Sequence, residues 1–156
     1  MNVTGWLLWG FVSTVVLTTI LSTSQGLHLT RMNIPFLLGT IVKPGSRSAA
    51  RVGFLLHLAN GWIFALVYVA AFHAWGGATW WRGAAIGVVH ACFVLAAVMP
   101  VLPAFHPRMA MADEGPTAAR RLEPPGFFAL HDGVPTPVSV LIAHVLYGIV
   151  LGAFYR

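Results

Sequence analysis

Histidine is the residue type in this sequence best suited to chemistry, because its ring donates and accepts hydrogen bonds, ligates metals and titrates near neutral pH. Two histidines share one local pattern, in which glycine follows four residues later and tyrosine seven residues after the glycine. The two copies are His57, Gly61 and Tyr68, and His144, Gly148 and Tyr155. Each member of the first copy is separated from its counterpart by the same number of residues. The pattern predicts either a binding site or a helix-packing device.

A cofactor site is one interpretation of these rings, with His90 as a third member. Two imidazoles from facing helices can be the axial ligands of haem b, and three can bind zinc or copper. The other interpretation is that each neutral ring hydrogen-bonds to a carbonyl or hydroxyl group of a neighbouring helix. We favour the second interpretation, in which no cofactor is bound. A haem or transition-metal site formed by His57, His144 and His90 is the alternative.

Other catalytic patterns are missing from the sequence. It has no Gly-x-Ser-x-Gly motif and no phosphate-binding glycine loop. The single cysteine, Cys92, excludes an internal disulfide and Cys-x-x-Cys chemistry. The segment from His106 to Met111 offers one imidazole and two thioethers, a soft set that could suit Cu(I), although membrane contact is the commoner role of such methionines. We therefore predict no catalytic residues and expect that the protein is not an enzyme.

The composition places these histidines in membrane helices. Hydrophobic residues make up 58% of the sequence and charged residues only 8%, whereas about a quarter of a soluble domain is charged. The length of 156 residues accommodates four spans of ~20 residues. We predict an all-α membrane protein with a single domain over residues 1–156. Its excess of basic residues is attributed to membrane topology and not to a nucleic-acid partner.

Four apolar stretches define the expected transmembrane helices. They cover about residues 5–25, 52–75, 81–100 and 138–155. The connections at about 26–51 and 101–137 are expected to be cytoplasmic loops. Residues 34–39 are apolar but too short to cross a bilayer, so they are expected to lie at the interface or against the bundle.

The distribution of basic residues predicts the orientation. The two long loops carry Arg31, Lys43, Arg47, Arg51, Arg108, Arg120 and Arg121. The opposite side has only Arg82 and Arg156. The positive-inside rule then places both termini on the non-cytoplasmic side. The second and fourth spans run in the same direction, which is compatible with two helical hairpins forming a parallel repeat.

Small residues predict which helix faces meet. Gly83 and Gly87 form a strip that leads to His90, and the fourth span continues its pattern from His144 through Gly148 to Gly152. Glycines allow the backbones of neighbouring helices to approach closely. We therefore expect all three rings to point into the bundle, with His57 and His144 at one depth and His90 several ångströms deeper.

The sequence resembles a family of small bacterial four-span proteins that is largely uncharacterised. The segments that carry the resemblance are Gly10–Thr14, Asn33–Gly39, Gly83–His90, Met99-Pro100, His106-Pro107, Pro125–Phe127 and the two histidine patterns. The resemblance implies a location in the bacterial plasma (inner) membrane and supplies no activity. It also implies that the loop motifs are structured elements.

These observations predict a non-enzymatic role. We expect a small accessory or structural subunit that contacts membrane lipid and packs against a larger membrane complex or against itself. The first alternative is a haem- or metal-binding membrane protein. The second is a small transporter or channel, which would need to oligomerise to enclose a path.

Overall fold

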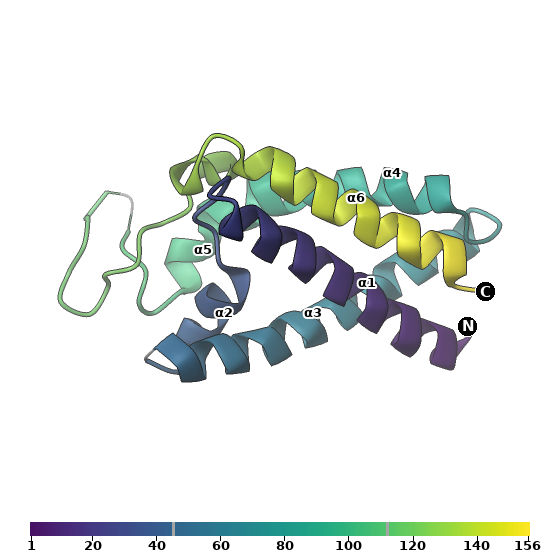
Figure 1. Cartoon of the computed structure of the whole chain (residues 1–156), viewed down its shortest axis with the longest axis horizontal. Coiled ribbons are helices and arrows are strands. Elements are labelled where there is room, and N and C mark those ends of the chain that lie inside the picture. Colours follow the sequence, from purple (N-terminus) through teal and green to yellow (C-terminus); the bar gives the residue numbers. More distant parts are fainter. Residues whose placement is uncertain (45, 112) are drawn as a thin grey trace.

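The computed structural model describes residues 1–44, 46–111 and 113–156, and this part of the chain is helical, without named strands (Figure 1). Its helices are α1 (Val3–Gly26), α2 (Ile34–Val42), α3 (Ser46–Ala74), α4 (Trp80–Phe93), α5 (Met99–Phe105) and α6 (Thr136–Phe154). A π-helical turn η1 (Val94–Val98) joins α4 to α5, and a 3-10 element η2 (Phe127–Asp132) precedes α6. Within the described residues, four stretches are long and apolar enough to cross a membrane: Val3–Gly26, Arg47–Ala74, Trp80–Phe105 and Thr136–Phe154. The prediction of an all-α protein with four such helices is confirmed.

The helix boundaries extend beyond two of the expected spans. The second apolar helix begins near Arg47 instead of residue 52, and the third continues to Phe105 instead of ending at residue 100. Pro100 does not end the third helix because a π turn comes before it, in which Met99 N–H donates to Val94 O. Such a turn widens the helix where a proline ring would otherwise clash with the preceding turn.

The four long helices run between the same two ends of the bundle. Both termini and the α3–α4 turn lie at one end of the bundle, which we call the terminal end (Figure 1). The connections from α1 to α2 and from α5 to α6 lie at the other, the loop end. At the terminal end, Asn2 N–H donates to Tyr155 Oη (3.1 Å) and Asn2 Nδ2 donates to Arg156 O (2.9 Å), which ties the N-terminus to the C-terminus.

Helices α4 and α6 pack through glycines. A Cβ atom on Gly83 would overlap the carbonyl of Gly148, and one on Gly87 would meet His144 O at 2.5 Å. Gly152 packs in the same way against the carbonyl of Thr79. The predicted glycine faces are therefore the packing faces of these helices. Because the two backbones touch at these glycines, the face that each helix presents to the other is fixed.

Helices α1 and α3 are held together by hydrogen bonds from two tryptophans and by a threonine side chain that packs against a glycine. Trp6 Nε1–H donates to Trp62 O (2.9 Å), and Trp62 Nε1–H donates to Leu7 O (2.8 Å). Further along the pair, the side chain of Thr14 fills the space above Gly61. Thr14 itself donates to Gly10 O (2.7 Å), one turn earlier, so its hydroxyl is satisfied within α1.

Helix α2 packs against the loop end of α3 and is held there by residues that follow α5. Gly39 and Gly53 bring the two backbones together. His106 is fully buried; its Nε2–H donates to Leu37 O (3.0 Å), and its Nδ1 accepts from Arg108 N–H (3.2 Å). The Arg108 guanidinium donates to the carbonyls of Thr40 and Ile41 at the end of α2. Both ring nitrogens of His106 are thus occupied, so this ring serves as a structural contact.

Candidate functional site

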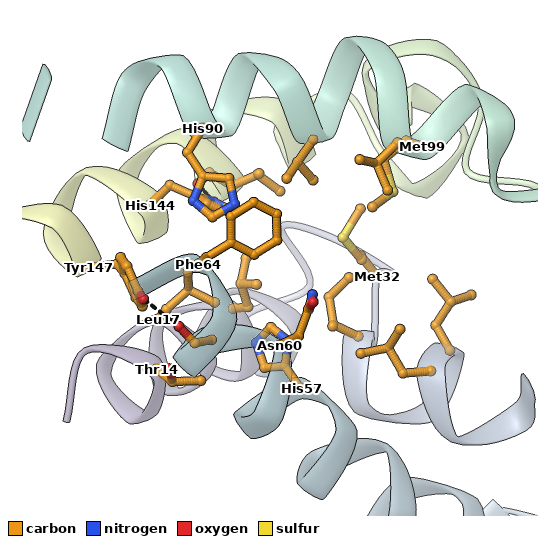
Figure 2. Close-up of a pocket in the computed structure, with 18 of the residues that line it drawn as sticks. Thr14, Leu17, Met32, His57, Asn60, Phe64, His90, Met99, His144 and Tyr147 are labelled. Carbon is orange, nitrogen blue, oxygen red and sulfur yellow. Dashed lines mark hydrogen bonds between the residues drawn. The ribbon is translucent and has the colours of Figure 1, made fainter. Parts of the chain in front are cut away.

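A cavity of about 130 Å³ lies inside the loop-end half of the bundle (Figure 2). Most of its lining is apolar, and the lining residues come from α1, α2, α3, α4, η1, α5 and α6 and from Met32, which lies between α1 and α2. The polar side chains that line it are Thr14, His57, Asn60, His90, His144 and Tyr147. The cavity therefore gathers all three histidines selected from the sequence, and their rings lie on the inside of the bundle as expected.

His90 and His144 are in direct contact. Their ring centroids are 4.6 Å apart and the rings are nearly perpendicular, at 83°. The glycine strip of α4 explains this contact, because Gly87 lies against the His144 carbonyl and His90 is three residues further along the same helix face. The structure thus places His90 beside His144.

A hydrogen bond shows which nitrogen of the His144 ring carries the hydrogen. His144 is buried and its Nδ1 lies 2.8 Å from Val140 O. A carbonyl only accepts, so Nδ1 carries the hydrogen and Nε2 of the neutral ring is left as an acceptor. No hydrogen bond to His144 Nε2 is present within the described residues. The ring thus offers one free acceptor to a group entering the cavity.

The ring of His90 is fixed by aromatic neighbours on α3. Phe64 stacks on it with centroids 4.0 Å apart, and the Tyr68 hydroxyl lies 3.2 Å from His90 Nδ1. Tyr147 packs edge-on against Tyr68 at 5.2 Å and donates its hydroxyl hydrogen to Gly61 O (2.7 Å). These contacts join α3, α4 and α6 on the terminal side of the cavity.

His57 lines the same cavity from α3. Its Nε2 is buried and has no hydrogen-bond partner in the described part of the chain. A buried polar atom without a partner costs roughly 1–3 kcal/mol. Asn60 lies one turn further along α3, is exposed, and points its carboxamide toward the same space in Figure 2.

Asn60, Phe64 and Tyr147 lie beside the histidines in the lining and were not selected from the sequence as site residues. A signal for two of them was present. Asn60 follows His57 by three residues, as Tyr147 follows His144, and residues three apart share a helix face. Phe64 carries no comparable signal, because an aromatic residue in an apolar span is ordinary.

The rings do not form a three-ligand metal site within the described residues, and His90 and His144 are not placed as an axial haem pair. Within the described residues, no three His, Cys, Asp or Glu side chains are grouped closely enough to hold a metal. Two imidazoles on opposite sides of a haem iron, with bonds of ~2.0 Å, would have centroids roughly 6 Å apart, whereas those of His90 and His144 are 4.6 Å apart. A cavity of about 130 Å³ is also much smaller than pockets for large ligands, which hold ~300–1,000 Å³.

No family model, no curated protein and no solved structure matches this chain. The chemistry of the site must therefore be inferred from its own groups. The cavity offers neutral donors and acceptors in an apolar surround. Such a site is suited to binding.

Proposed function

We propose that this chain is a small integral protein of a bacterial plasma membrane that acts as an accessory subunit and packs against a larger membrane complex. The observation that carries the proposal is the exposure of Asn60. It is the central residue of α3, which extends from Ser46 to Ala74. At 1.5 Å per residue, its carboxamide lies roughly 20 Å from either helix end.

An exposed amide at this depth is unfavourable in hydrocarbon, where polar groups lack water as a partner. Asparagine side chains commonly hydrogen-bond across helix interfaces in membranes. On the same stretch of α3, Phe54, Leu55 and Leu56 are exposed by 38%, 64% and 38%. Three consecutive exposed residues cover most of the helix circumference, so this half of α3 has room for another helix.

The orientation in the membrane is part of the proposal. The basic residues of the two long connections favour a cytoplasmic loop end, with both termini on the opposite side. The parallel repeat is supported by two equivalent contacts. Gly61 packs against α1, and Gly148 packs against α4, so each pattern glycine contacts the first long helix of its own hairpin.

A transporter or channel is less well supported. Such a protein needs a polar path through the bundle, and the terminal side of the cavity is closed by packed side chains. Tyr68, Phe72, Tyr147 and Leu151 are each exposed by 1% or less. An oligomer would have to form the path between copies.

Purification from native membranes tests the proposal. The tagged chain, extracted in a mild detergent, is expected to carry another membrane protein in a fixed ratio, measured by native mass spectrometry. Asn60→Leu should weaken this association about tenfold, because a helix–helix hydrogen bond in a membrane contributes ~1–2 kcal/mol.

The matched control is Thr19→Leu, which replaces an exposed polar side chain on α1. It should leave the association unchanged. A chain that is extracted from its native membrane as a monomer without any stoichiometric partner would contradict the proposal.

A further inference from the structure

We propose that the cavity binds the ring of a neutral lipophilic molecule that carries a hydroxyl group, with the rest of the molecule extending into the bilayer. This ligand site is additional to the accessory role. It is carried by the size of the cavity, its lateral opening, the hydrogen-bonding groups left free inside it and the absence of charge in its lining.

The size of the cavity selects a single ring. Its volume is about 130 Å³. An engineered apolar cavity of ~150 Å³ in another protein binds benzene. One six-membered ring therefore fills this space, whereas a fused-ring or headgroup-sized molecule does not enter.

The cavity opens sideways, between α3 and the η1–α5 segment. Asn60 is exposed at its edge, and Phe64, Val98 and Leu102 are half-buried although they line it. These residues belong to helices that are long and apolar enough to span a membrane, so the opening faces hydrocarbon wherever no partner helix covers it. A molecule already dissolved in the bilayer can insert its ring without crossing water.

The free polar atoms select a hydroxyl group. His144 Nε2 is an acceptor, since Nδ1–H is donated to Val140 O. His57 Nε2 is buried and has no partner within the described residues. A hydroxyl both donates and accepts, so it can donate to His144 Nε2, and it can pair with His57 Nε2 once that ring turns toward the cavity. In an apolar surround each such bond is strengthened by the low local dielectric.

The lining also excludes charged ligands. No Lys, Arg, Asp or Glu is among its described residues. An ionised head would therefore be desolvated without a counter-charge, which is strongly unfavourable. The ligand class is a neutral ring with a hydroxyl group and an apolar tail.

The wall opposite α3 has an unusual helix geometry. Val94 and Val98, the first and last residues of the π turn η1, both line the cavity. Single π turns inside α-helices often occur at functional sites because they reposition side chains. Here the turn forms part of the cavity wall.

Binding of small probes to the purified full-length protein tests the proposal. The probes are 4-pentylphenol, pentylbenzene and 4-pentylbenzoate, which share a ring and tail and differ in the polar group. Binding is measured by native mass spectrometry and by the shift in unfolding temperature. We expect 4-pentylphenol to bind saturably and about tenfold more tightly than pentylbenzene, and 4-pentylbenzoate not to bind.

Variants locate the binding. Val98→Trp fills the cavity and should abolish binding of both neutral probes. Val89→Trp places the same residue on α4 at a position exposed by 68% and should bind like the wild type. His57→Leu should lower the affinity for 4-pentylphenol without lowering the unfolding temperature of the free protein, since it removes an unpartnered polar atom.

Two results would overturn the proposal: equal affinity for 4-pentylphenol and pentylbenzene, or unchanged binding in Val98→Trp. A lower unfolding temperature for His57→Leu would show instead that His57 holds helices together. The measurements use the protein alone, so they succeed or fail independently of any partner found by co-purification.

Discussion

At the scale of single residues, a ring nitrogen without a hydrogen-bond partner distinguishes a buried histidine that can bind a ligand from one that is structural. His106 and His144 are both buried, but His106 uses both ring nitrogens in hydrogen bonds and His144 uses only Nδ1 within the described residues.

Two carboxyl groups at the loop end also differ in burial. Arg31 forms an exposed ion pair with Glu123 at 3.3 Å, while the neighbouring Asp132 is partly buried. Exposed ion pairs contribute little to stability.

The Asp132 carboxyl is expected to make stability depend on pH. Burial raises its pKa, and Glu123 adds to this shift, while Arg31 and His131 oppose it. Because the folded-state pKa lies above the unfolded one, the stabilising contribution is fully present below the unfolded pKa. That contribution is lost as the pH rises through the folded pKa. The unfolding temperature should therefore fall as the pH rises through the carboxyl range.

Asp132→Asn should remove this slope and raise the unfolding temperature at neutral pH. The comparison is a pH series of thermal unfolding in detergent. Asp113→Asn, at an exposed position in the same long connection, serves as the control and should keep the wild-type slope. An unchanged slope in Asp132→Asn would exclude Asp132 as the origin.

At the scale of elements, glycine contacts decide how the helices are placed. Helices α4 and α6 meet backbone to backbone at Gly83 and Gly148. Helix α2 meets α3 in the same way, at Gly39 and Gly53. These contacts position the histidines, because the side chain three or four residues away on the same face must then point into the adjoining space.

Gly148→Ala should separate α4 from α6, because the added Cβ would overlap the Gly83 carbonyl. Overpacking of this kind costs ~1–3 kcal/mol, which a denaturant or thermal unfolding series in detergent can measure. Gly26→Ala is the matched control: a Cβ there has nothing within 4 Å. Equal stability of the two variants would show that the α4–α6 contact is not tightly packed.

At the scale of the whole molecule, the packing is uneven around the bundle. α1 and α6 pack along one side, whereas α3 and α4 make few contacts beyond their connecting turn. If the two hairpins form a repeat, the α1–α6 interface and the α3–α4 interface occupy equivalent positions. The first is closely packed and the second is open. The cavity lies at the open one. In that case the cavity would mark a departure from the repeat.

Reporter fusions test the orientation of the whole bundle. Alkaline phosphatase fused after Ala118, in the long connection, should be inactive, because a cytoplasmic loop end keeps the enzyme from its oxidising compartment. Fusion after Gly77, in the α3–α4 turn at the terminal end, should be active. The reverse pattern of activities would show that the loop end faces outward.

The sequence alone was sufficient for the number of helices that are long and apolar enough to cross a membrane, and for the glycine faces of α4 and α6. Both follow from local properties: hydropathy sums along a segment, and residues three or four apart share a face whatever the neighbours are. The extension of the third helix through Pro100 was not predictable, because no local pattern signals the π turn that precedes it.

Only the tertiary structure decided which histidines meet. The repeated pattern paired His57 with His144, yet the ring in contact with His144 is that of His90. The relative depth of two helices is set by where their backbones touch, here at Gly83 and Gly148, and no pattern within either helix encodes that register. For the same reason the cavity beside His57 and Asn60 appears only once all the helices are packed.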